Sequence, residues 1–141
     1  MTKPSYLQPH EGRRMRIGPF AFVFKAGHQT ESGYTFAEVT VPPGAQNGPH
    51  LHPCEETMYL LSGELEFFAA DGERHRLAVG ASVHVPASTI HGYVNATTTD
   101  ARLLVVAPVG QEDLFTDLAL AAGDPTRVAA AMARHGVKAR V

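Results

Sequence analysis

The chain has 141 residues, of which 44% are hydrophobic, and its formal net charge at pH 7 is −2. This length and hydrophobic fraction are typical of one globular domain with a substantial core. The small net charge excludes the basic surface that a partner such as nucleic acid or an anionic membrane would require.

The N-terminal residues 1–18 are predicted to form an arm, because proline, glycine and charged residues interrupt any hydrophobic period there. This segment has no apolar run of signal-peptide length, and the longest apolar stretch, Leu103 to Val109, is far too short to cross a bilayer. Cys54 is the only cysteine, so no internal disulfide can form. These features predict a cytoplasmic protein without a membrane partner.

Residues 19–110 alternate short apolar runs with turn signals, the pattern of an all-β barrel or sandwich. The pair Asp71-Gly72 between two such runs is a strong signal for a two-residue hairpin. We expect about nine strands in one domain. The clearest predicted strands are 20–25, 34–41, 56–61, 65–69, 73–79, 82–85, 91–96 and 102–107.

Residues 111–141 change character and are predicted to form two short helices that extend the same domain. Apolar residues recur at helical spacing over 111–122. Asp124 and Pro125 then supply an N-cap and a proline at the first position of a second helix, which Gly136 ends. We expect both helices to pack on the outside of the barrel or on a partner subunit.

Four residues carry the predicted chemistry: His50, His52, Glu56 and His91. Three imidazoles and one carboxylate suit a divalent transition metal and leave coordination positions free. His50 and His52 are two residues apart, so on a strand both rings point to one face, and Glu56 has the same parity. His91 must arrive from another strand, which only a folded sheet or barrel can arrange. The sequence therefore predicts a metal centre.

These residues lie in two segments that resemble the two motifs of the cupin superfamily. The segment from Gly44 to Gly63 matches every fixed position of the first motif: glycine, five residues, HxH, three residues, glutamate, six residues, glycine. The segment from Gly80 to Asn95 resembles the second motif, with Ser88 where the pattern has glycine. That departure concerns a turn, so it affects local backbone shape rather than a metal ligand.

The resemblance implies a cupin double-stranded β-helix, or jelly-roll barrel, in which an N-terminal arm often forms an edge strand. The chain as a whole is similar to small bacterial cupins described as quercetin-dioxygenase-like. This similarity implies a metal-dependent dioxygenase that cleaves a small aromatic or enolic, flavonol-like substrate with dioxygen. The metal would be iron, manganese, nickel, cobalt, copper or zinc, and related barrels are often homodimers.

Two residues are candidates for catalytic roles. Glu56 could accept a substrate proton as well as bind the metal. Tyr93 lies two residues from His91 and could aim its hydroxyl at the substrate. Two other functions stay open: a redox-neutral metalloenzyme such as a decarboxylase or isomerase, and a small-molecule-binding cupin without catalysis.

The remaining candidates have structural interpretations. Cys54 lies between two ligands, but the family does not use that position, and His84 and His75 are expected to be structural or surface residues. The remaining histidines belong to no sequence motif and are expected to face solvent: His10, His28 and His135. The expected barrel interior includes five aromatic residues: Phe20, Phe22, Phe24, Phe36 and Phe67.

Overall fold

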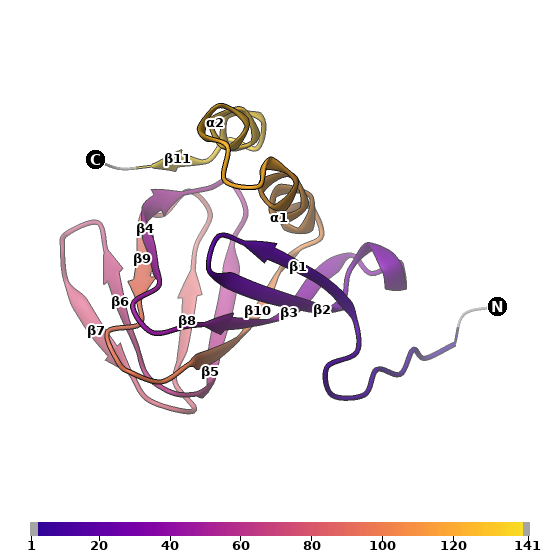
Figure 1. The fold of residues 1–141 in the computed structure, drawn as a ribbon, viewed down its shortest axis with the longest axis horizontal. Helices are drawn as coiled ribbons and strands as arrows, with labels where there is room; N and C mark the ends of the chain where they lie inside the picture. Colours follow the sequence, from indigo (N-terminus) through magenta and orange to yellow (C-terminus); the bar gives the residue numbers. More distant parts are fainter. Residues whose placement is uncertain (1–2, 140–141) are drawn as a thin grey trace.

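A computed structural model describes residues 3–139, and these form two antiparallel sheets with helices at one end (Figure 1). The strands are β1 Arg13–Ile17, β2 Phe20–Ala26, β3 Tyr34–Val41, β4 Gln46–Leu51, β5 Glu56–Ser62, β6 Leu65–Ala69, β7 Arg74–Leu77, β8 Ser82–Val85, β9 His91–Val94, β10 Ala101–Pro108 and β11 Lys138–Ala139. The helices are the 3-10 helix η1 His28–Thr30 and the α-helices α1 Gly110–Ala121 and α2 Pro125–Arg134.

The two sheets have the strand orders β1-β2-β3-β10-β5-β8 and β11-β4-β9-β6-β7. Consecutive strands often lie in different sheets, as in a jelly roll: β3 belongs to the first sheet and β4 to the second. The predicted all-β fold with two C-terminal helices is thereby confirmed. None of the helices among residues 3–139 is long and apolar enough to span a membrane.

Alternation along the strands places the core between the sheets. In β3, Thr35 and Ala37 are buried and Phe36 between them is only half-buried, because successive side chains point to opposite faces. The prediction that Phe36 lies in the barrel interior is therefore wrong. Of the other four aromatic candidates, Phe20 is partly buried against the core, and three are buried: Phe22, Phe24 and Phe67.

The predicted N-terminal arm contains β1, which is the edge strand of the six-stranded sheet and pairs antiparallel with β2. In β1 the side chains alternate between the exposed Arg14 and Arg16 and the partly buried Met15 and Ile17. This is the period of a strand with one solvated face. The arginines hid that period in the sequence because they made the segment appear uniformly polar.

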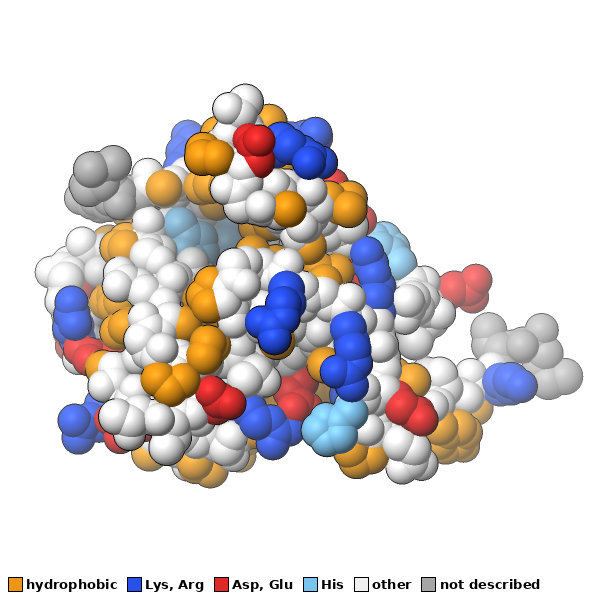
Figure 2. Space-filling view, viewed as in Figure 1, with side chains coloured by type: hydrophobic (Ala, Val, Ile, Leu, Met, Phe, Trp, Pro, Cys, Tyr) orange, Lys and Arg blue, Asp and Glu red, His pale blue; other side chains and the backbone are white. Residues whose placement is uncertain are grey.

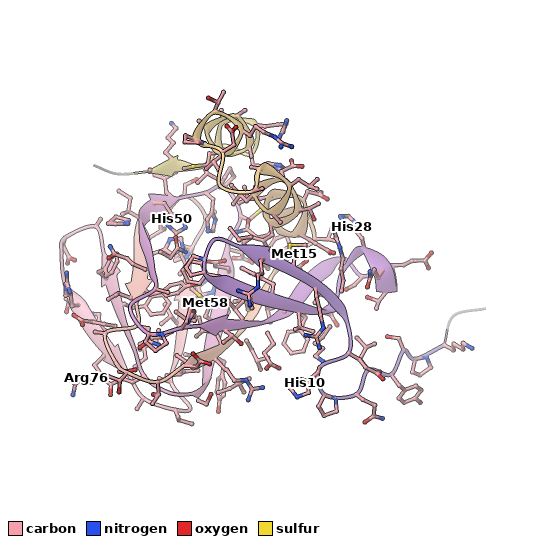
Figure 3. The ribbon with its side chains drawn as sticks, in the orientation of Figure 1. His10, Met15, His28, His50, Met58 and Arg76 are labelled. Carbon is pink, nitrogen blue, oxygen red and sulfur yellow. The ribbon has the colours of Figure 1, made fainter. Side chains whose placement is uncertain are left out.

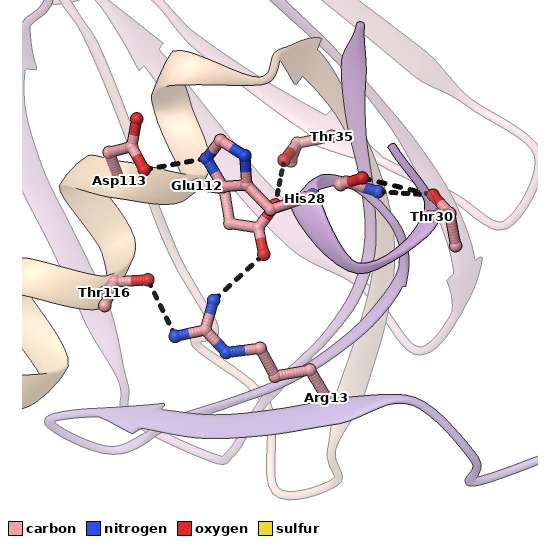
Figure 4. Close-up of polar contacts among 8 residues, drawn as sticks. Arg13, His28, Thr30, Thr35, Glu112, Asp113 and Thr116 are labelled. Carbon is pink, nitrogen blue, oxygen red and sulfur yellow. Dashed lines mark hydrogen bonds and ion pairs between the residues drawn. The ribbon is translucent and has the colours of Figure 1, made fainter. Parts of the chain in front are cut away.

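One buried carboxylate fastens α1 to the barrel (Figure 4). Glu112 is 1% exposed and accepts hydrogen bonds from the Arg13 guanidinium at 3.0 Å and the backbone N–H of His28 at 2.9 Å. The Thr35 hydroxyl donates to the same carboxylate at 3.3 Å. The three donors come from β1, η1 and β3, so Glu112 joins four elements that are distant in sequence. The sequence analysis missed this role.

The second helix begins as predicted. The Asp124 carboxylate accepts a hydrogen bond from the Arg127 backbone N–H at 3.1 Å, and Pro125 is the first helical residue. Both helices lie together over one end of the barrel (Figure 1). From there the chain turns back through Gly136 to β11, which pairs with β4.

Candidate metal centre

Three histidines converge at one end of the barrel, from positions far apart in the sequence. His50 lies in β4 and His91 opens β9, and the register of these antiparallel strands places the two residues opposite each other. Their ring centroids are 4.4 Å apart, and those of His52 and His91 are 4.9 Å apart. The potential ligand nitrogens of all three rings lie within 4.8 Å of one another. The predicted convergence of these rings is therefore present.

Each of the three rings is oriented by a nearby backbone carbonyl. The Nδ1 atom of each ring contacts a backbone carbonyl oxygen two residues away in the chain. These contacts, each 2.8 Å long, join His50 to Gly48, His52 to Cys54 and His91 to Thr89. Because a carbonyl can only accept, each Nδ1 carries a proton, and Nε2 is the atom directed at the cluster. Metal-binding histidines are commonly oriented in this way.

Glu56, the first residue of β5, lies beside the histidines. Its Oε1 atom is 3.0 Å from Nε2 of His91 and 3.4 Å from Nε2 of His52. Burial opposes ionisation of this carboxyl, but the hydrogen bonds from His52 and His91 outweigh it and lower the pKa of Glu56 to about 2. Burial lowers the pKa of His52, but the contact with Glu56 outweighs it, and the pKa of His52 is raised.

His50, the remaining residue of the cluster, has a different electrostatic environment. Burial lowers the pKa of His50 to about 4, although the Gly48 carbonyl acts in the opposite direction and the other two imidazoles add to the decrease. His50 is therefore neutral at pH 7, the form that binds a metal. Three imidazoles with Nε2 directed inward and one ionised carboxylate fit a divalent transition metal ion.

His50, His52 and Glu56 lie on the wall of a cavity of about 430 Å³, and His91 adjoins Glu56. This volume is within the usual range for small-molecule sites. Figure 2 shows the molecule hollowed beneath the helical layer, with histidine surface at the edge, and Figure 3 places His50 beneath α2 and β11. Apart from the polar groups, the wall is mostly apolar, and it includes Ile17, Phe20, Phe22, Val39, Met58, Val105, Leu114, Phe115, Leu118, Val128 and Met132.

Tyr93 lines the same cavity and is 6% exposed. Its ring packs against Phe67 at 5.1 Å and against Phe20 at 6.0 Å between centroids. Burial raises the pKa of Tyr93 far above its ordinary value, although a hydrogen bond with Asn47 acts in the other direction. The hydroxyl therefore keeps its proton, so Tyr93 can donate a hydrogen bond but does not act as a base at neutral pH.

The helices contribute to the site, a role that the sequence analysis missed. Both α1 and α2 line the cavity, and so do Val137 and Ala139 at the C-terminal strand β11. In that strand Ala139 pairs with His50. An apolar stripe on a helix indicates burial but does not say whether the buried surface is a barrel wall or a ligand cavity.

The other predicted histidines lie outside the cavity. His84 is exposed, as expected for a structural residue, and its Nδ1 is 2.8 Å from the Thr57 hydroxyl. His75 and His10 are also exposed. His28 is exposed, as expected, whereas His135 is half-buried and the prediction that it faces solvent is wrong. They contact carboxylates of α1, Asp113 at 2.8 Å and Asp117 at 2.6 Å.

Cys54 is half-buried, and burial raises the pKa of its thiol. Its thiol does not belong to the histidine cluster among the described residues. The backbone carbonyl of Cys54, which orients His52, is the atom that contributes to the site.

The chain is similar in sequence to a known enzyme. The chain is 29% identical over 124 residues to quercetin 2,3-dioxygenase of Bacillus subtilis (strain 168). The aligned region covers 86% of this chain and 35% of that enzyme. The chain thus spans about a third of the length of this relative.

Two solved structures share the fold at low sequence identity. The polyketide cyclase RemF from Streptomyces resistomycificus has a TM-score of 0.70 at 20% identity, over 76% of this chain and 80% of its own. KdgF from Halomonas sp. has a TM-score of 0.64 at 22% identity, over 75% of this chain and 94% of its own. At these identities the likeness concerns the fold alone.

The family itself is established by a match to the cupin domain. That match covers residues 37–107, about half of the chain, and includes all four clustered residues. Both sequence motifs lie within it, and the two sheets have the jelly-roll arrangement. The chain therefore belongs to the cupin family.

Proposed function

We propose that this protein is a metal-dependent dioxygenase that cleaves a small aromatic or enolic, flavonol-like substrate. The observation that carries the proposal is the convergence of three histidines and Glu56 beside a largely apolar cavity, whose wall includes His50, His52 and Glu56. Similarity to a quercetin 2,3-dioxygenase supports the substrate class. Dioxygen would be the second substrate.

In this proposal His50, His52 and His91 hold the metal through Nε2 and Glu56 holds it through its carboxylate. Iron, manganese, nickel, cobalt, copper and zinc all accept such a ligand set. When bound, the ion would act as a Lewis acid for an enolate oxygen and, if redox-active, would support reaction with dioxygen.

The chain's own residues supply proton transfer and positioning. Among the described residues, Glu56 is the only carboxylate on the cavity wall, and its low pKa keeps it ionised at neutral pH. It is thus the group able to accept a proton from an enolic hydroxyl. The protonated Tyr93 hydroxyl offers a hydrogen bond to a substrate oxygen. The apolar wall excludes water and favours a flat organic substrate.

The test begins with elemental analysis of protein purified without added metal. Purified protein is then incubated with quercetin, with and without oxygen, while oxygen consumption and product are measured. We expect oxygen consumption that requires metal and is lost in His50→Ala and Glu56→Ala. Equal turnover without oxygen, or with zinc, would instead support a redox-neutral enzyme. Stabilisation by ligand without any product would support a binding protein.

We also propose that the protein is a homodimer. Tyr34, Tyr59 and Val106 are 53%, 45% and 41% exposed, and their registers place them on the outer face of one sheet. A second copy could cover this apolar face. Sedimentation velocity of the wild type should show a dimer that Tyr59→Lys weakens; a monomeric wild type would contradict the proposal.

A further inference from the structure

Gln111, the second residue of α1, is a buried polar residue of the cavity wall that the proposed chemistry leaves unused. It is 3% exposed and lines the same cavity as His50 and Glu56. Its side chain forms no hydrogen bond with residues 3–139, and yet no fully buried side-chain nitrogen or oxygen atom in that range lacks a partner. The amide of Gln111 must therefore face the open space of the cavity.

An amide in this position offers two N–H donors and one carbonyl acceptor. Within residues 3–139 these groups have no protein partner, so the fold itself does not explain a glutamine there. In the cavity, the other polar side chains come from β4, β5, β9 and the loop after β4: Asn47, His50, His52, Glu56 and Tyr93. Gln111 is the polar residue that the helical layer supplies.

The next residue in the chain holds Gln111 in place. Glu112 is bonded to Arg13, to the backbone of His28 and to Thr35, which fixes the first turn of α1 against the barrel (Figure 4). An amide on a fixed backbone loses little freedom when it binds a ligand, so it can select among ligands.

We propose that Gln111 is a specificity-determining residue whose amide hydrogen-bonds a second hydroxyl or carbonyl group of the substrate. This inference rests on the proposed function, because it assumes that the histidine cluster holds the other end of the same molecule. The preferred substrate is then a compact, largely apolar molecule with a chelating enolone group and a further polar group.

The first experiment needs no ligand. Gln111→Met replaces the amide by an unbranched apolar side chain of similar length, and Gln111→Asn retains the amide on a shorter side chain. Thermal unfolding of the purified proteins should show Gln111→Met about 2–4 °C above wild type, since an unpartnered polar group is removed. A lower melting temperature for Gln111→Met would show a structural hydrogen bond and would overturn the inference.

The second experiment compares two flavonols. Quercetin and 3-hydroxyflavone share the enolone group, but 3-hydroxyflavone lacks the additional hydroxyl groups. Binding to nickel-loaded protein, measured by absorbance titration, should favour quercetin in the wild type. Gln111→Met and Gln111→Asn should weaken quercetin binding about tenfold, the usual effect of one lost hydrogen bond, and leave 3-hydroxyflavone nearly unchanged.

Leu118→Met is the matched control, because it changes another cavity residue of α1 without changing polarity. It should affect both flavonols equally. If the Gln111 variants also weaken both flavonols equally, or neither, the inference on Gln111 fails while the proposed function stands. If the nickel-loaded wild type binds neither flavonol, the proposed function fails, and the substrate class assigned to Gln111 fails with it.

Discussion

Two buried carboxylates, Glu56 and Glu112, are 7% and 1% exposed, but their partners differ. Glu112 is bonded by an arginine, a backbone N–H and a threonine hydroxyl, and each of these donors is permanent at physiological pH. Glu56 contacts Nε2 of His52 and of His91, the ring atoms that would bind a metal.

This comparison shows that burial of a charge does not by itself identify a functional site. A carboxylate with fixed donors joins elements of the fold, as Glu112 joins α1 to the barrel. A carboxylate whose partners are exchangeable, as for Glu56, can take part in chemistry. Substitutions at the two positions should therefore affect different properties.

The largest effect on folding is expected from Glu112→Ala. The substitution leaves the Arg13 guanidinium and two other donors without their acceptor, so the free energy of unfolding should fall by about 3–5 kcal/mol. Urea unfolding followed by circular dichroism measures this loss. Asp113→Ala, at the exposed neighbouring position, is the control and should lower the free energy of unfolding far less. Equal losses in the two variants would contradict the role assigned to Glu112.

Glu56→Gln should affect metal binding rather than stability. The substitution keeps the shape of the side chain but removes its charge, so affinity for a divalent metal should fall at least about 100-fold, more than for typical residues that only support a ligand. Competition with a chromogenic chelator measures the affinity. Glu55→Gln, one residue away and exposed, should bind metal as the wild type does. Unchanged affinity in Glu56→Gln would remove Glu56 from the proposed ligands.

The pH dependence of the metal-free protein should report on His50. Its pKa is about 4 in the folded chain against 6.5 ordinarily, so between these values the unfolded chain binds a proton that the folded chain does not. The stability due to neutral His50 is present above pH 6.5 and is lost as the pH falls towards 4, on the order of 3 kcal/mol in total. Urea unfolding across this range should therefore show a smaller loss for His50→Gln than for wild type.

His84→Gln is the matched control for that series, because it removes an imidazole from the outside of the barrel. If His50→Gln loses as much stability as the wild type between pH 6.5 and 4, the burial assigned to the His50 ring is wrong.

Much of the barrel could be predicted from the sequence because strand alternation and turn residues are local signals. The strand over Tyr34–Val41 was predicted with its exact bounds. By contrast, β4 contains Gly48 and Pro49 and has no regular alternation, so only the histidine spacing suggested a strand there. The two-residue β11 exists because β4 offers it an edge, which is a tertiary effect that no local pattern contains.

The site was predictable to the extent that its residues lie in motifs. The spacing of His50, His52 and Glu56 predicted one face for these three, and the resemblance of the second motif added His91. Gln111 and Glu112 have no such spacing, because the cavity and donors they meet come from remote parts of the chain. Their two positions also look alike in sequence, as polar residues in the first turn of a helix. Only the fold separates the amide that faces the cavity from the carboxylate that joins four elements.

The smallest expected effect concerns the turn that supports His52. Ser88 has φ 56°, in the left-handed region, and its backbone N–H donates to the His52 carbonyl at 2.8 Å. Glycine adopts this conformation without steric cost but gains freedom in the unfolded chain, so Ser88→Gly should stabilise the protein by only about 0.5–1 kcal/mol.

Ala87→Gly is the control in the same turn. Its φ is not positive, so only the entropy of the unfolded chain changes, and a loss of about 0.5–1 kcal/mol is expected in urea unfolding. Metal affinity should be unchanged in Ser88→Gly, because the hydrogen bond to His52 uses a backbone N–H that glycine also has. A gain in stability without a change in metal affinity would show that this turn, like Glu112, serves the fold. Weaker metal binding would instead place Ser88 with Glu56, among the residues on which the site depends.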